Sequence, residues 1–210
     1  GSTSGRESEG VKRLKMSAET VQLFDPVTGH VILCVSQNLA RDFSWLDEHQ
    51  ISDSAEDLGM VTVNKRPCPF RPDSKALTHD EFVTPGGMRR FTEQLIDYAT
   101  WTALALARRE KVVVHCRSGR SRSPCVVLVF FMVFRGLRQS VGRKWLGPTF
   151  REQRPEITRI SADFPNFYKF HNVLIDMQKR LDLCESWIHD RVRENVRNYV
   201  KLCPPGTEDY

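Results

Sequence analysis

The chain has 210 residues, of which 40% are hydrophobic and 27% charged, values typical of a soluble globular protein with one well-buried domain. Its 31 Lys and Arg against 26 Asp and Glu give a net charge of +5, which favours anionic partners but is too mild to indicate a nucleic-acid-binding protein. The six cysteines form no CxxC pair and no Cys/His ligand spacing, so neither a zinc site nor a disulfide framework is expected. We therefore expect free thiols in a reducing compartment, the cytoplasm first and the nucleus as an alternative.

Residues 1–20 are predicted to be a polar tail outside the fold. They begin with GSTSGRESEG, which lacks the apolar stretch of a signal peptide and has the look of an expression remnant. The longest apolar run, CVVLVFFMVF at 125–134, is too short to span a bilayer and is followed by Arg135 and Gly136. This run is therefore predicted to be a core helix, with no stable insertion into a membrane.

Strand-like and helical segments alternate in the first half of the chain. Apolar runs at 30–35 and 60–64 predict short strands. Between them, the helical spacing of apolar side chains predicts a helix over 38–51. Its expected apolar face consists of Leu39, Phe43, Leu46 and Ile51. Residues 65–86 are rich in proline and turn-forming residues and are predicted to be a long surface loop, of a kind that often carries function.

The same alternation continues after this loop. An amphipathic helix is predicted over 88–110. Its apolar face is formed by Met88, Phe91, Leu95, Tyr98, Thr102 and Ala105, with Leu106 beside them. The run KVVVHC at 111–116 lacks polar alternation and predicts a buried central strand. The apolar helix at 125–134 follows, with Pro124 at its start.

The remainder of the chain is predicted to be helical. The helix at 140–155 is expected to be interrupted at Gly147 and Pro148, and a further helix has an apolar face. That face is formed by Phe167, Phe170, Leu174, Met177 and Leu181. A charged amphipathic helix follows at 185–202. The whole pattern predicts an α/β fold: a central, mostly parallel sheet flanked by helices on both faces, with a helical C-terminal extension.

The sequence HCRSGRSRSP at 115–124 lies between the predicted central strand and the apolar helix. Ligands of parallel sheets bind beyond the carboxyl ends of the strands, which is the place of this loop. A tight arc from Cys116 to Arg122 turns successive N–H groups inward and forms an anion nest the size of a phosphate, at the positive end of the helix dipole. Gly119 supplies the backbone freedom that such an arc needs.

Two side chains of this loop are suited to phosphoryl transfer. The forked guanidinium of Arg122 matches two oxygens of a phosphoryl group. Helix termini and neighbouring cations lower the pKa of a cysteine from ~8.5 into the range ~3.5 to ~7.5, which makes Cys116 a candidate thiolate nucleophile. Taken alone, Cys116 would be a small buried hydrophobic residue. Together with its neighbours it predicts transfer through a cysteinyl-phosphate.

These residues resemble the signature of the cysteine-dependent protein tyrosine phosphatases. The Gly-x-Ser-Arg-Ser form is most similar to the dual-specificity branch, and the chain is identified as an atypical member of it. The segment GLRQSVGRKWLGPTFREQRPEI is similar to that branch's next helix, which ends in an Arg-Pro pair, here Arg154 and Pro155. The resemblance covers about 25–182. It implies a phosphatase-like fold with a catalytic domain at 21–182 and a helical extension with a tail at 183–210.

The resemblance also implies a role for each residue of the loop. Cys116 is the nucleophile, and Arg122 clamps the phosphate and stabilises the transition state. The phosphate-binding set comprises Arg117, Ser118, Gly119, Arg120, Ser121 and Arg122, of which residues 117–121 contribute backbone N–H groups. Ser123 is expected to hydrogen-bond the cysteine sulfur and to ease breakdown of the phospho-enzyme. His115 is expected to orient the loop and to help hold the thiolate, and it can be a satisfied core histidine at the same time. Neither a metal nor a cofactor is implied.

The family also requires an aspartate as general acid, on a loop before the helix that leads to the signature strand. In this chain that loop is 65–86. Asp80 is the preferred candidate because it stands shortly before the helix at 88–110. Asp73, in RPDS, is similar to the Trp-Pro-Asp of the tyrosine-specific branch and is the alternative, with Glu81 third. For each carboxylate taken alone, a solvated loop charge is the simpler interpretation.

The substrate expected from the resemblance is a protein phosphorylated on tyrosine or on serine and threonine. Arg117 and Arg120 make the rim of the nest more positive and favour multiply charged substrates, phosphoinositides or RNA 5′-phosphates, unless they pair with local acids. A different class of function is a phosphate-binding interaction module with little turnover, in which the charged helix at 185–202 serves for docking. The oligomeric state does not follow from the sequence.

Two further cysteines are candidates for protecting an oxidised Cys116 by a disulfide. Cys68 lies in the loop that carries the candidate acids, and Cys125 lies just beyond the signature. The simpler interpretation is core packing for Cys125 and no role for Cys68.

Overall fold

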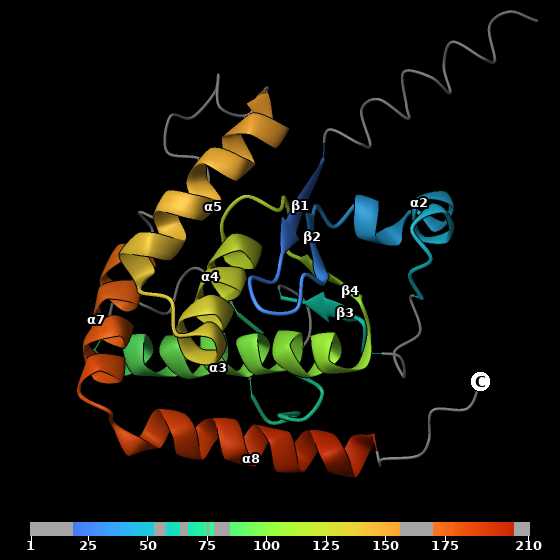
Figure 1. Cartoon of the computed structure of the whole chain (residues 1–210). Coiled ribbons are helices and arrows are strands. Elements are labelled where there is room, and N and C mark those ends of the chain that lie inside the picture. Colours follow the sequence, from blue (N-terminus) through green and yellow to red (C-terminus); the bar gives the residue numbers. More distant parts are fainter. Residues whose placement is uncertain are drawn as a thin grey trace, which may run out of the picture.

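The computed structural model describes residues 19–52, 58–63, 67–74, 76–77, 85–155 and 170–203, and a four-stranded sheet lies at its centre. The strands are β1 (Thr20–Phe24), β2 (Val31–Val35), β3 (Met60–Thr62) and β4 (Lys111–His115), in the order β1-β2-β4-β3. Strands β2 and β3 both pair with β4 in parallel, and β1 is antiparallel to β2. The predicted α/β fold with a mostly parallel sheet is therefore confirmed (Figure 1).

The central position of β4 explains its unbroken valine run. Val112 and Val114 belong to the larger core, whereas Val113 belongs to a smaller core on the opposite face. Because side chains alternate along a strand, only a strand buried on both faces needs apolar residues at every position. In the register of the sheet, His115 is level with Val35 of β2 and with Thr62 of β3. The carboxyl ends of the three parallel strands therefore meet at one edge.

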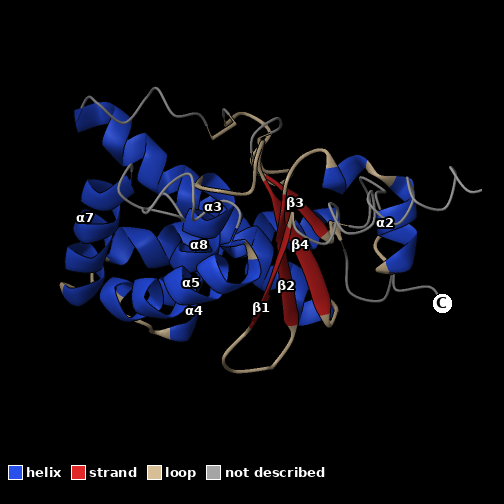
Figure 2. Cartoon of the chain, turned by 90° about the horizontal axis from the view of Figure 1, so that it is seen from above, coloured by secondary structure: helices blue, strands red, loops and turns tan. Residues whose placement is uncertain are grey.

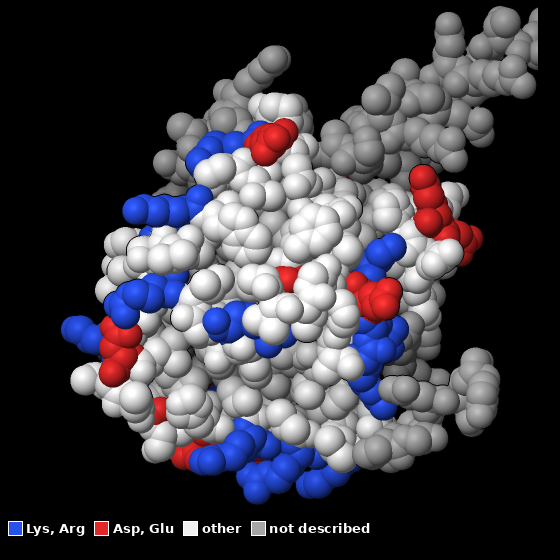
Figure 3. Space-filling view, viewed as in Figure 1, with Lys and Arg blue, Asp and Glu red and all other residues white. Residues whose placement is uncertain are grey.

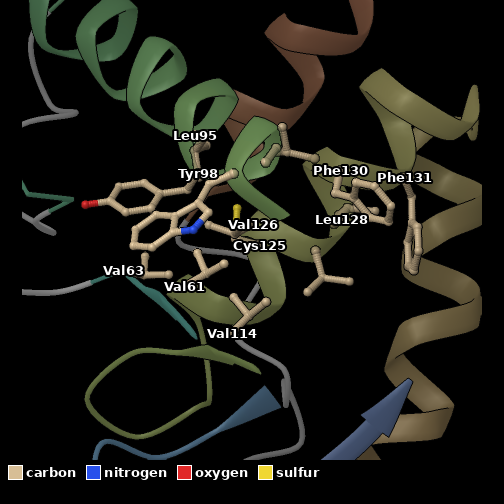
Figure 4. Packing of buried hydrophobic residues seen from close by; sticks show 14 of the residues in the cluster. Val61, Val63, Leu95, Tyr98, Val114, Cys125, Val126, Leu128, Phe130 and Phe131 are labelled. Carbon is tan, nitrogen blue, oxygen red and sulfur yellow. The ribbon is translucent and has the colours of Figure 1, made fainter. Parts of the chain in front are cut away.

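Helices cover the two faces of the sheet unequally. The larger core is built by α3 (Pro85–Arg108), α4 (Arg122–Arg135), α5 (Gln139–Gln153), α7 (His171–Asp182) and α8 (Ser186–Leu202). The smaller core contains the one-turn 3-10 helix η1 (Leu39–Arg41) and α2 (Phe43–Glu48). Figure 2 shows α2 on one side of the sheet and these longer helices on the other. In Figure 4, Val61 and Val114 of the sheet pack beneath Tyr98 of α3 and Val126 of α4.

Helix α4 begins directly after the loop of interest. Ser121 is its N-cap residue, and Pro124 lies in the first turn, where a backbone N–H has no partner within the helix. The helix ends at Gly136, whose φ of 67° is accessible to glycine without strain. Ten consecutive residues from Ser123 to Met132 are buried, so the predicted core helix is confirmed. Within the described part of the chain, no helix is both long and apolar enough to cross a bilayer.

Three elements differ from the sequence predictions. Strand β1 lies in a stretch for which no strand was predicted. The helix predicted over 38–51 is split at Asp42, whose backbone is extended and whose side chain caps α2 by accepting from the Trp45 N–H at 3.1 Å. This cap resets the helical register, so that Trp45 is buried while Phe43 is 71% exposed. Helix α5 runs through Pro148 without interruption, because Leu146 and Phe150 on either side are fully buried and hold it.

Candidate active site

The loop from Cys116 to Ser121 connects β4 to α4 at the edge where the parallel strands end. The start of the loop is tied to the segments that follow β2 and β3: the Gln37 N–H donates to the Arg117 carbonyl at 3.2 Å, and the Val63 N–H donates to the His115 carbonyl at 2.9 Å. Gly119 has a φ of 69°, and a Cβ atom there would lie 3.0 Å from the backbone carbonyl of Val35. Both its conformation and its close approach to β2 therefore require glycine, as the sequence predicted.

Cys116 is held in this loop as a buried thiol, 1% exposed, with its Sγ 3.4 Å from the Ser123 Oγ. Burial raises the pKa of a thiol, but here hydrogen bonds from the hydroxyl and backbone N–H of Ser123 oppose it. The charge of Arg122 and the backbone N–H of Gly119 act in the same direction, and the net result is a lowered pKa for Cys116. The geometry thus favours a thiolate, which is the nucleophilic form of cysteine.

Arg122 is the first residue of α4 and extends to a segment distant in sequence. Its Nη1 donates to the carbonyl of Leu77 at 3.1 Å, and Leu77 is completely buried. The Nε of Arg122 is also buried and has no hydrogen-bond partner among the described residues. One nitrogen of the guanidinium is therefore used to fix its orientation, and a second retains its donor for an anion in the loop.

His115 lies at the end of β4 and is 4% exposed. Its Nε2 is 3.0 Å from the Thr62 Oγ1 on β3. This contact joins the residue before the nucleophile to the adjacent strand and supports a role in orienting the loop. Thr62 was not among the predicted site residues, and its place at the end of a strand parallel to β4 was the available signal for it.

The other residues of the predicted phosphate-binding set differ in exposure. Arg117 is exposed, Ser118 and Arg120 are half-buried, and Gly119 and Ser121 are buried. The backbone of this set lies at the N-terminus of α4, where the first N–H groups of a helix lack partners and attract anions.

Arg154 is a buried cation beside the loop that sequence reasoning did not assign to the site. It is 4% exposed, and its Nη1 donates to the Ser118 carbonyl at 3.4 Å. It follows directly after α5, and its side chain supports the loop through this bond to the Ser118 carbonyl. The Arg-Pro pair at 154–155 was the only sign of it in the sequence.

Of the three candidate general acids, one lies within the described residues. Asp80 and Glu81 lie outside them. Asp73 is exposed, in the segment 67–74. The contact between Arg122 and Leu77 shows, however, that the predicted long loop reaches the first residue of α4, next to the loop of Cys116. The choice between Asp80 and Asp73 stays a prediction.

All six cysteines are free thiols. Burial raises the pKa values of Cys68 and Cys125, which are therefore packed as neutral side chains. Burial also raises the pKa of Cys34 on β2, with a further contribution from Cys116. The charge of Cys116 thus acts on the Cys34 thiol, an interaction that was not predicted from the sequence. The proposed protective disulfides of Cys116 with Cys68 or Cys125 stay predictions.

One known protein shows a partial similarity to this chain. The similarity is to Protein-tyrosine-phosphatase IBR5 of Arabidopsis thaliana, with 39% identity over 56 residues, which is 27% of this chain and 20% of that protein. The chain therefore matches about a fifth of the length of this relative. No family model matches, and no solved structure matches. The similarity supports a relationship to the protein tyrosine phosphatase superfamily, at that level and no finer.

Proposed function

We propose that this protein is a phosphatase of the dual-specificity type, which hydrolyses phosphorylated tyrosine, serine or threonine of protein substrates through a cysteinyl-phosphate. The observation that carries the proposal is the environment of Cys116. A buried thiol with a lowered pKa lies 3.4 Å from the Ser123 hydroxyl and at the N-terminus of α4. Such a thiolate next to an anion nest is suited to attack on phosphorus. The partial similarity to a tyrosine phosphatase supports the same chemistry.

In the first step, the Cys116 thiolate attacks the phosphorus of the substrate. The S–P bond forms while the bond from phosphorus to the substrate oxygen breaks. The N–H groups of residues 117–121 and the guanidinium of Arg122 stabilise the charge that develops on the phosphoryl oxygens. The leaving oxygen takes its proton from a carboxylic acid, for which Asp80 is the preferred candidate.

In the second step, a water molecule attacks the phosphorus of the cysteinyl-phosphate. The new P–O bond forms, the S–P bond breaks, and inorganic phosphate leaves. The carboxylate of the first step accepts the proton of the water, which restores the acid. The Ser123 hydroxyl, placed 3.4 Å from the sulfur, donates to the departing thiolate and makes it a better leaving group.

The proposal is tested on the wild-type protein with a small aryl phosphate as substrate. We expect steady hydrolysis that continues in the presence of a metal chelator, since Cys116 and Arg122 supply the nucleophile and the charge. Rapid acid quenching followed by peptide mass spectrometry should show one phosphate on the peptide that contains Cys116. A folded wild-type protein that releases no phosphate contradicts the proposed function.

Asp80 is expected to be the general acid. Leu77 is bound to Arg122, and Asp80 follows three residues later, a chain length of about 10 Å at full extension. Replacing Asp80 by Asn should lower kcat for phenyl phosphate, a substrate with a basic leaving group, by about 100-fold. The loss should be smaller for p-nitrophenyl phosphate, whose leaving group hardly needs a proton.

Asp73→Asn is the matched control for this prediction. It removes the same charge from an exposed position of the same loop, and its rates should stay within about threefold of wild type, as is usual for a surface substitution. The assignment is wrong if Asp80→Asn leaves the rate with phenyl phosphate intact, or if Asp73→Asn produces the leaving-group-dependent loss instead.

A second candidate function is favoured by the exposed side chain of Arg117 at the loop. An exposed cation beside the nest suits a substrate with several phosphates, such as a phosphoinositide or a 5′-triphosphate RNA. Comparing kcat/KM for these substrates with kcat/KM for phosphopeptides separates the two candidates. If Arg117→Ala lowers kcat/KM for a multiply charged substrate and leaves the phosphopeptides unaffected, the second candidate is favoured.

A further inference from the structure

Helix α8 contacts the rest of the molecule through buried polar groups. Asp97 of α3 is 1% exposed and accepts from the Nε and Nη2 of Arg191, both at 2.8 Å. It also accepts from the Nδ2 of Asn195 at 2.8 Å. Burial raises the pKa of Asp97, and these hydrogen bonds together with the charge of Arg71 oppose that rise. The bidentate pair of Arg191 with Asp97 fixes α8 against α3 in one position, because each buried polar group needs its partner.

Asn195 extends this network to the segment 67–74. The residue is completely buried, and while its Nδ2 donates to Asp97, its Oδ1 accepts from the Nε of Arg71 at 2.7 Å. The remaining nitrogens of Arg71 donate to both carboxylate oxygens of Glu194 at 3.1 and 2.8 Å. Arg71 is thus held by three hydrogen bonds to α8. In Figure 1 this segment lies between α3 and α8.

Further contacts keep the same segment in place. The Asn198 Nδ2 donates to the carbonyl of Phe70 at 3.2 Å, and the Phe70 ring meets the Tyr199 ring edge-on at 6.0 Å. Ser74 bonds back to the Arg71 carbonyl through its N–H and its hydroxyl, at 2.9 and 2.8 Å. The anchoring therefore extends from α8 through the turn after Arg71, toward Leu77.

Leu77 connects the segment to the nest. Its carbonyl accepts from the Nη1 of Arg122, and its backbone N–H hydrogen-bonds the hydroxyl of the buried Tyr98 on α3. The peptide groups of Leu77 are therefore fixed on both sides. Since the Leu77 carbonyl uses the Nη1 of Arg122, it determines where the remaining donors of that guanidinium lie.

We propose that Arg71 and Asn195 are positioning residues, through which α8 holds the segment 67–74, and with it Leu77 three residues further along the chain, so that the Leu77 carbonyl orients the guanidinium of Arg122. This inference rests on the proposed function, because it assigns a catalytic purpose to the orientation of Arg122. The hydrogen bonds of their side chains join them to each other, to Glu194 and to Asp97. Loss of either should leave the thiol in place and reduce the stabilisation of the transition state.

The test is a double-mutant cycle on kcat/KM for p-nitrophenyl phosphate, with Arg71→Ala and Arg122→Lys alone and combined. In the wild-type background, Arg71→Ala should lower kcat/KM by about tenfold, which is within the range found for residues that are coupled through one hydrogen-bond network. In the Arg122→Lys background, the same change should cost less than about twofold, because the fork it orients is already gone. Vanadate, which mimics the transition state, should lose affinity in parallel with kcat/KM.

Arg193→Ala is the matched control, since it removes an arginine of α8 whose side chain is 70% exposed and pairs with Asp190 on the surface. It is one of the exposed basic residues along α8, where blue side chains gather at the lower edge of Figure 3. Its activity should equal that of wild type. Asn195→Ala should reproduce the loss of Arg71→Ala, because both break the same chain of hydrogen bonds. Variants of Arg191 are unsuitable, because they remove the bidentate cationic partner of the buried Asp97 carboxylate and so destabilise the fold itself.

Folding and catalysis are separated by two measurements on every variant. The near-UV circular dichroism spectrum reports the packing, and the rate of Cys116 alkylation by iodoacetamide at neutral pH reports the loop. If Arg71→Ala fails to fold, Arg71→Lys, which keeps a charge for Glu194 but loses the fork to Asn195, takes its place in the cycle. Equal losses in both Arg122 backgrounds, or no loss, overturn the inference while the proposed function stands. An inactive wild type contradicts the proposed function instead.

Discussion

Replacing Cys116 by serine is expected to abolish hydrolysis of aryl phosphates, with kcat lower by a factor on the order of 10⁴ or more, as for other enzymes that lose a covalent nucleophile. The lowered pKa of Cys116 is the reason, because the site stabilises a thiolate by Ser123 and Arg122. A serine hydroxyl in the same environment keeps its proton and attacks phosphorus poorly. Steady-state phosphate release at saturating substrate measures the loss.

Cys184→Ser is the control for this substitution, since Cys184 is an exposed free thiol in the connection between α7 and α8. It should be as active as wild type. Cys116→Ser should still bind inorganic phosphate in a calorimetric titration, because Arg122 and the helix N-terminus remain. Residual turnover of more than about a tenth of wild type would place the nucleophile elsewhere, since a lost nucleophile costs far more than that.

The pH dependence of alkylation checks the state of the thiol directly. A lowered pKa means that the thiolate persists as the pH falls. The rate at which iodoacetamide alkylates Cys116 should therefore be half-maximal below about pH 8.5, the pKa of an ordinary thiol. Cys125 and Cys68 should not react in that range, because burial raises their pKa values. A half-maximal rate at or above the ordinary value contradicts the thiolate.

Replacing Arg122 by lysine is expected to lower kcat/KM for the same substrate by about 100- to 1000-fold, the cost of removing one preorganised donor from a transition state. Lysine keeps the positive charge but not the planar fork that matches two phosphoryl oxygens. In Arg122, Nη1 bonds the Leu77 carbonyl while Nε keeps its N–H for a phosphoryl oxygen, and the single amine of a lysine cannot reproduce this arrangement. Competitive inhibition by vanadate should weaken to a similar extent.

Arg138→Lys is the matched control for Arg122→Lys. Arg138 is 59% exposed and pairs with Asp182 at the surface, so the same exchange there should change kcat/KM by less than about twofold. If Arg122→Lys is equally mild, the guanidinium does not stabilise the transition state and the mechanism needs another cation. Arg154, buried beside the Ser118 carbonyl, is then the first residue to examine.

The central strand and its loop could be predicted because their signals are local. Three consecutive valines at 112–114 predict a strand buried on both faces, and the structure places that strand between β2 and β3. Gly119 was expected to provide an unusual backbone conformation, and it does. Helix α4 likewise follows from an apolar run with Pro124 at its start and Gly136 at its end. In each case the physical cause lies within a few residues of its effect.

The failures concern elements whose conformation depends on distant partners. Strand β1 forms at the edge of the sheet, where the backbone N–H and carbonyl of Gln22 bond to the side chain of Gln153, 131 residues away. Pro148 remains inside α5 because buried neighbours outweigh the hydrogen bond that a proline removes. No window of sequence around β1 or Pro148 contains these partners.

In the candidate site, too, the features with local causes could be predicted and those that depend on distant partners could not. The nucleophile, the glycine arc and the fork of Arg122 follow from residues 115–124, because strand, turn and helix propensities act over short distances along the chain. The contacts of Thr62 with His115 and of Leu77 with Arg122 join residues 53 and 45 positions apart, and the Arg71–Asn195 bond joins residues 124 positions apart. Only the packing of α3, α8 and the sheet brings these groups within hydrogen-bonding distance. The chemistry of the loop could therefore be predicted from the sequence, whereas the orientation of Arg122 is determined by the tertiary structure.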